Sequence, residues 1–238
     1  MWTRRAVALA VVAAIGAAGY LLWLRDSSLV AVREVSVTGV SSAESRDVRA
    51  ALTDAARGMT TLHVREDALR DAAAAFPTVE SITTDARFPN GLAIEVRERE
   101  PVGVIEANGR DLPVAGDGTL LPGISTAGLE LPAIEATRVE GSATRVDDEA
   151  LDQARILGAA PGPLRPLVDG ASVDDRGAVL ELSDGIVLVF GDGSEVVAKW
   201  AAAARILADR ELGGLSYIDL RAPDRPAVGG ASAPPGAL

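Results

Sequence analysis

The sequence has no cysteine, one histidine and one lysine among its 238 residues. Without cysteine it can form neither disulfides nor thiolate metal sites, and one histidine cannot complete a tetrahedral zinc site. Aromatic residues make up only 3% of the chain, so the core must consist mainly of aliphatic and small side chains. The net charge is −11. This acidic balance, without a basic stripe, argues against a nucleic-acid partner.

Recognisable catalytic and ligand-binding motifs are also absent. His63 has no nucleophile or second metal ligand near it in the sequence, and no serine lies in a Gly-x-Ser-x-Gly elbow. The glycine-containing stretch 191–193 lacks the rest of a phosphate-binding loop and is interpreted as a tight turn. The acidic groups at 147–149 and 174–175 lack the spacing of a calcium loop. The sequence therefore predicts no enzyme, cofactor, metal or small-molecule substrate; a carboxylate pair that meets only in the folded chain is the alternative left open.

A run of 19 uncharged residues extends from Ala6 to Leu24. At ~1.5 Å per residue a helix of this length crosses the roughly 30 Å hydrocarbon core of a bilayer. Two arginines precede the run, so the positive-inside rule predicts a single-pass protein with a cytoplasmic tail at 1–5 and the rest of the chain outside the cytoplasm. A cleaved signal peptide, cut near Gly16, is the alternative, and it exports the same residues.

The first part of the exported region predicts two helices and three strands. Apolar alternation and helical spacing give, in chain order, a strand, two helices and two strands (32–37, 45–57, 65–75, 79–87 and 92–96). Asn90-Gly91 is a strong hairpin signal, and Gly91 is expected to have a positive φ in a type I′ turn. The order β-α-α-β-β covers residues 32–100.

From 101 to 228 the pattern is typical of a β-rich domain with two helices packed on an antiparallel sheet. The strands are predicted at 102–106, 112–115, 119–121, 178–182, 186–190 and 215–220. One helix is predicted over 147–160, starting at Asp147, and a second after Ser194, which is expected to cap it. Residues 229–238, rich in glycine, proline and alanine, are predicted to be disordered. The fold class is therefore α+β with an N-terminal transmembrane helix.

Several short stretches resemble the FtsQ/DivIB family of bacterial cell-division proteins. VSVTG, FPTV, RFPNGLAIEV and EREPV follow one another at Val35–Gly39, Phe76–Val79, Arg87–Val96 and Glu98–Val102. They are similar to the first strand, the helix exit, the hairpin and the last residues of an FtsQ-type POTRA domain. Further along, Lys199-Trp200, Tyr217–Arg221 and Pro226–Val228 resemble the family's last helix and closing strands.

The resemblance implies a non-enzymatic scaffold of the divisome in the cell membrane at the division septum. It implies FtsB/DivIC-like and FtsL-like partners, which are single-span coiled-coil proteins, bound by strand addition at the last strand. Mapped onto this sequence, the partner-binding residues are Tyr217, Arg221, Arg225, Pro226, Ala227, Val228 and Gly229, although Tyr217 could equally belong to the core. The alternatives are a POTRA-containing assembly or secretion component and an exported binding protein.

Overall fold

The structure, a computed structural model, describes residues 5, 9–12, 19–20, 25–107, 109–135, 143–209 and 214–230. The chain divides into two compact units, 1–99 and 100–238, and each has its own hydrophobic core. Helices and sheet occur in both units, so the predicted α+β class is confirmed. Most of the predicted membrane span, 6–24, and the end of the predicted tail, 231–238, lie outside the described residues.

Among the residues that the structure describes, no helix combines the length and the apolar character needed to cross a membrane.

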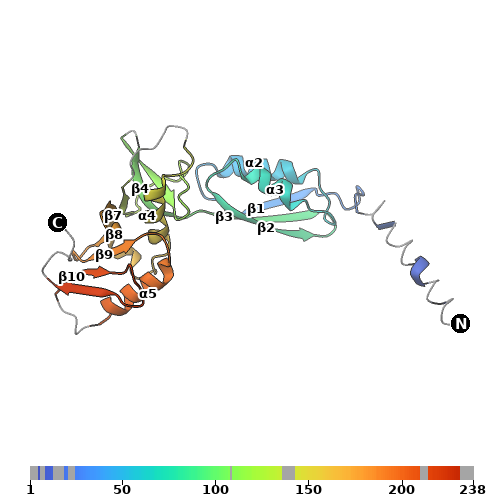
Figure 1. Cartoon of the computed structure of the whole chain (residues 1–238). Helices are drawn as coiled ribbons and strands as arrows, with labels where there is room; N and C mark the ends of the chain where they lie inside the picture. The colour runs from blue at the N-terminus through green and yellow to red at the C-terminus, as the bar shows by residue number, and fades with distance from the viewer. Residues whose placement is uncertain are drawn as a thin grey trace. The chain divides into compact units, whose positions relative to one another are not determined.

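The first unit places two helices on one face of a three-stranded sheet (Figure 1). Its elements are β1 (Glu34–Thr38), α2 (Ser45–Ala56), α3 (Glu66–Ala73), β2 (Val79–Arg87) and β3 (Gly91–Glu98). β3 lies between the other strands, parallel to β1 and antiparallel to β2. The buried helix residues Leu52 and Leu69 share one core with Leu92 and Ile94 of β3. The predicted order β-α-α-β-β is confirmed.

The β2–β3 hairpin differs from the predicted type I′ turn. Phe88, Pro89 and Asn90 connect the two strands, and the Phe88–Pro89 peptide bond is cis. Gly91 does not have a positive φ; it pairs with Arg87 as the first residue of β3. The prediction was wrong because an Asn-Gly turn of this type has a two-residue loop. Here the loop has three residues, so the glycine falls in the strand.

The second unit is built on an eight-stranded sheet with the order β11-β10-β9-β8-β7-β6-β4-β5. The strands are β4 (Pro101–Ala107), β5 (Arg110–Ala115), β6 (Ala133–Ile134), β7 (Val168–Asp174), β8 (Gly177–Leu182), β9 (Val187–Gly191), β10 (Leu215–Asp219) and β11 (Ala227–Gly230). Helix α4 (Asp148–Gly158) connects β6 to β7, and α5 (Val196–Leu207) connects β9 to β10. A short 3-10 helix, η2 (Arg165–Leu167), precedes β7.

The sheet is mixed, not antiparallel as predicted. β4 and β6, β6 and β7, and β9 and β10 are parallel pairs. In the pairs β6–β7 and β9–β10 a helix between the two strands returns the chain to the end of the sheet from which it left, so the second strand runs parallel to the first. The sequence also failed to predict β6 and β7, while the strand predicted at 119–121 is reduced to isolated bridges at Thr119 and Leu120.

Two of the three aromatic side chains of this unit meet where α5 contacts α4 and the sheet. The rings of Phe190 on β9 and Trp200 on α5 have centroids 5.1 Å apart and are tilted by 56°. The indole Nε1 of Trp200 donates a hydrogen bond of 2.8 Å to the carbonyl of Ile156 on α4. All three residues are buried. This cluster fixes α5, and hence the crossover that brings β10 beside β9.

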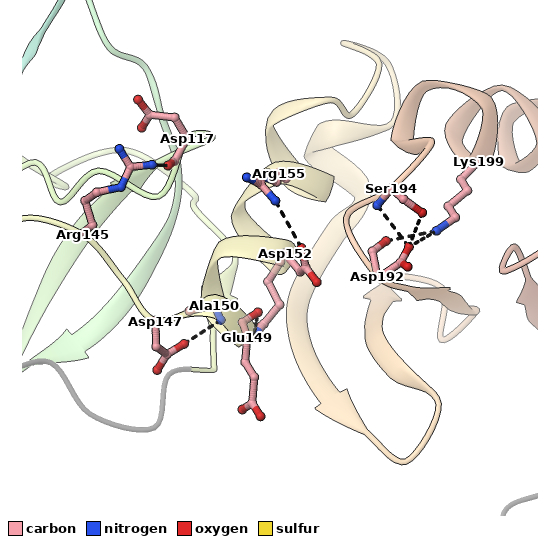
Figure 2. Close-up of polar contacts among 11 residues, drawn as sticks. Asp117, Arg145, Asp147, Glu149, Ala150, Asp152, Arg155, Asp192, Ser194 and Lys199 are labelled. Atoms are coloured by element: carbon pink, nitrogen blue, oxygen red, sulfur yellow. Dashed lines mark hydrogen bonds and ion pairs between the residues drawn. The ribbon is translucent and has the colours of Figure 1, made fainter.

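The start of α4 agrees with the sequence, whereas the start of α5 does not. Asp147 caps α4 by accepting a hydrogen bond of 2.8 Å from the backbone N–H of Ala150 (Figure 2). The N-cap residue of α5 is Glu195, with a φ of 47° and no side-chain cap, in place of the predicted Ser194. The hydroxyl of Ser194 instead donates to Oδ1 of Asp192 at 2.5 Å.

An ion pair joins α5 to the loop before it. Nζ of Lys199 donates to Oδ1 of Asp192 at 2.8 Å and to the Asp192 backbone carbonyl at 3.1 Å (Figure 2). The lysine side chain is only 2% exposed, so its ammonium group has lost nearly all contact with water. The carboxylate of Asp192 accepts hydrogen bonds from Lys199 and from Ser194. These bonds, of which that from Lys199 has the largest effect, lower the pKa of Asp192 to about 2. Lys199 therefore holds the loop before α5 against the helix.

We expect Asp192→Ala to destabilise the protein more than Lys199→Met does. The alanine leaves a buried ammonium group without its carboxylate, which costs about 1–3 kcal/mol. The methionine has a similar length and leaves no buried charge. Denaturant unfolding of the purified chain at neutral pH measures both changes. Equal losses for the two variants would contradict this account of the pair.

The same pair predicts a pH dependence. In the folded protein the pKa of Asp192 is lowered from its ordinary value of 3.8 to about 2. The ionised carboxylate therefore stabilises the fold above pH 3.8. That contribution is lost as the pH falls through about 2. Unfolding free energies measured across this range should fall less steeply for Lys199→Met than for the unchanged chain. An identical slope would show that the lysine does not control this titration.

Candidate functional site

β11 is an edge of the larger sheet. It pairs antiparallel with β10, so that Tyr217 lies opposite Gly229, Ile218 opposite Val228 and Asp219 opposite Ala227. Among the strands of the described residues, β10 is its only neighbour. An edge strand has unpaired backbone N–H and C=O groups along its outer side, and an extended segment of another chain can pair with them.

Val228 is the residue of β11 whose backbone groups face outward. The carbonyl of Gly229 accepts a hydrogen bond of 3.3 Å from Oγ of Ser216 on β10, so it faces inward. Backbone groups of successive residues point to opposite sides of an antiparallel strand. The N–H and C=O of Val228 therefore face away from β10, and its side chain is 38% exposed. Both its donor and its acceptor are accessible to an added strand.

The ring of Tyr217 lies over Gly229, so a larger residue at position 229 would have to displace the ring. A Cβ at position 229 would lie 2.2 Å from Cε1 and 2.7 Å from Cζ of Tyr217, far inside contact distance. Tyr217 is half-buried. Its ring covers one face of the β10–β11 pair and leaves the outer backbone edge open.

This contact also corrects the predicted boundary of the tail. Gly229 and Gly230 were expected to begin a disordered segment, but both belong to β11. Glycine-rich composition favours disorder when nothing packs on the chain. Here the ring of Tyr217 uses the space that a side chain at position 229 would need.

Arg221 is held by the end of β10. Its Nη2 donates to Oδ2 of Asp219 at 2.7 Å, and its Nε lies 3.1 and 3.2 Å from the two carboxylate oxygens. Hydrogen bonding by Arg221 is the main reason that the pKa of Asp219 is lowered. A Cβ at Gly191 would also meet Cγ of Arg221 at 3.0 Å, which places the arginine stem over β9. The side chain therefore ties β10 to its neighbour.

The remaining predicted residues lie in the loop that leads into β11. Arg225 is exposed, and Pro226 is half-buried. Pro223, Asp224 and Pro226 line one side of a shallow pocket whose other side is formed by residues of α5, namely Ala202, Arg205 and Ile206. Sequence reasoning missed these helical residues because helical spacing carries no sign of which loop lies beside a helix.

The chemistry-bearing residues singled out in the sequence do not gather into a catalytic arrangement around this edge. His63 lies in the first unit, where Nδ1 is 3.3 Å from Oδ1 of Asp26 and the Arg25 guanidinium also contacts the ring. Within the described part of the chain, no cluster of three or more histidine, aspartate or glutamate side chains could hold a metal ion.

Residues 30–99 match the family model described as POTRA domain, FtsQ-type, and residues 103–221 match Cell division protein FtsQ/DivIB, C-terminal. The second match ends at 221, so β11 lies beyond it.

Curated proteins similar to this chain are named Cell division protein FtsQ. Cell division protein FtsQ of Streptomyces collinus is 28% identical over 96% of this chain and 90% of its own length. That of Novosphingobium aromaticivorans is 32% identical over 71% of this chain and 51% of its own length. That of Streptomyces venezuelae is 28% identical over 90% of this chain and 79% of its own length. Because the FtsQ/DivIB model alone matches half of the chain and a POTRA match precedes it, this chain belongs to the FtsQ/DivIB family of cell-division proteins.

Proposed function

We propose that this protein is a non-enzymatic scaffold of the divisome, anchored in the membrane, that binds FtsB/DivIC-like and FtsL-like partners and links them to septal cell-wall synthesis. The observation that carries the proposal is the open edge of β11, with the backbone of Val228 facing outward. An extended partner segment can continue the sheet there by strand addition. Family membership supports the division role.

The small side chains of β11 allow a partner segment to approach its backbone closely. Its sequence is Ala-Val-Gly-Gly, so only Val228 has a side chain larger than a methyl group. A four-residue strand offers few outward hydrogen bonds, each worth a net ~0.5–1.5 kcal/mol. Side-chain contacts beside the strand must therefore supply much of the affinity. The exposed face of Val228 and the pocket between α5 and the loop 223–226 are the adjoining surfaces.

Replacing Val228 with proline should weaken partner binding by about tenfold or more. Proline removes the outward N–H and adds a ring at the edge, while the hydrogen bonds from Ala227 and Gly229 to β10 are kept. Val228→Thr is the matched control, because it keeps the N–H and the β-branched shape. Pull-down or titration with the FtsB/DivIC-like partner measures the effect, and the unfolding midpoint checks the fold. Normal binding by a folded Val228→Pro variant would place the partner site elsewhere.

The anchor is the second component of the proposal. Residues 6–24 are proposed to cross the membrane once, with 1–5 in the cytoplasm and 25–238 outside it, since the uncharged run follows two arginines. A reporter that is active only outside the cytoplasm should be active when fused after Leu238. Activity of a cytoplasm-only reporter at the same position would show that the orientation is wrong. A mature protein shortened near Gly16 would favour a cleaved signal peptide.

A further inference from the structure

Two large apolar side chains are exposed at one end of the first unit. Phe88, in the β2–β3 hairpin, is 73% exposed, and Leu29, in the segment that leads into β1, is 61% exposed. Exposing both to water is unfavourable, and neither contributes to the core of the unit. Their position identifies a surface at which a partner could cover them.

Hydrogen bonds join the segment that contains Leu29 to the hairpin that contains Phe88. The side-chain amide of Asn90 donates to the carbonyls of Leu29 at 3.0 Å and Ala31 at 2.7 Å. Thr61 connects the same two segments, because its N–H donates to the carbonyl of Val30 and its Oγ1 to that of Pro89, both at 2.8 Å. The two segments that carry these exposed side chains are therefore joined at one end of the unit, here called the anchor-proximal tip (Leu29, Phe88 and Pro89).

This tip begins almost directly after the uncharged run. The run ends at Leu24, and the next residue, Arg25, already contacts the folded unit: its carbonyl accepts a hydrogen bond of 2.5 Å from Oγ1 of Thr60. Leu29 follows Leu24 by five positions, a reach of at most roughly 18 Å even when fully extended. A turn in which the N–H of Val30 donates to the carbonyl of Ser27 at 3.1 Å shortens that reach. The headgroup zone extends roughly 5–7 Å beyond the hydrocarbon core.

We propose that the anchor-proximal tip inserts Phe88 and Leu29 into the headgroup region of the outer leaflet and thereby orients the first unit on the membrane. This inference rests on the proposed anchor at 6–24. Apolar and aromatic side chains are favourable at the boundary between headgroups and acyl chains. Arg33 and Arg87, both exposed beside the tip, can place their stems against lipid and their guanidinium groups among phosphates.

The proposed partner of the tip is the bilayer surface, and the tip binds it through apolar contacts. The net charge of −11 opposes attraction to anionic lipid as a whole. Arg87 is also partly neutralised by Asp85, whose carboxylate lies 3.4 Å from its Nε. The contact should therefore form on zwitterionic phosphatidylcholine and should not require anionic lipid.

The absence of cysteine makes a direct test possible on the full chain. Single variants Phe88→Cys and Leu29→Cys carry a polarity-sensitive fluorophore in phosphatidylcholine vesicles with a quencher attached to the lipid headgroup. Ser81→Cys is the matched control: it is exposed on the same strand, β2, and lies six residues before Arg87, roughly 20 Å away. Ala14→Cys, read with an acyl-chain quencher, reports whether residues 6–24 enter the bilayer.

We expect the probes at positions 88 and 29 to show blue-shifted emission and headgroup quenching. The probe at position 81 should show neither. If the probe at position 14 is quenched and those at 88 and 29 stay in water like that at 81, the membrane contact is overturned and the anchor stands. A probe at position 14 that remains in water overturns the anchor and this inference with it. Since Phe88 and Leu29 are exposed, either variant alone can be read if the other folds poorly.

Discussion

The pairing of β11 with β10 is the interaction on which the proposed binding edge depends. The ring of Tyr217 on β10 occupies the space where a side chain at position 229 of β11 would project. β10 itself is fixed, because Ile218 and the residue that follows the strand, Leu220, are fully buried. The outer strand is thus attached to a strand of the core, while its own outer backbone groups stay accessible to a partner.

The position of β10 is in turn set by the crossover through α5. Trp200 packs on Phe190 and bonds to α4, and Lys199 binds the loop at the start of the helix. The single lysine of the chain and two of its eight aromatic residues lie on β9 and α5. Because α5 also lines the pocket beside the loop 223–226, the same helix that places β10 shapes the surface next to the free edge.

Periodicity in the sequence predicts α2, α3 and the two strands of the β2–β3 hairpin well, since their apolar faces repeat at the spacing of one structure. It fails where the structure depends on distant contacts. Gly91 was assigned to a turn because the loop length was not visible in the sequence. Ser194 was assigned as a cap from its residue type, but its hydroxyl donates to Asp192 instead. β7 was missed, since its burial does not alternate regularly.

The candidate site was less accessible to sequence reasoning than the fold. A family resemblance, and not periodicity, directed attention to Tyr217 and Val228. The structure places Tyr217 on β10 opposite Gly229 and Val228 on the edge strand β11. The inward carbonyl of Gly229, the restraint of Arg221 by Asp219 and the adjoining residues of α5 are tertiary contacts without a local signature. Amide hydrogen exchange at Val228 tests the central claim most directly. In the protein alone this amide should exchange rapidly while that of Gly229 is protected, and the FtsB/DivIC-like partner should protect Val228; rapid exchange at Val228 in the saturated complex would contradict strand addition at β11.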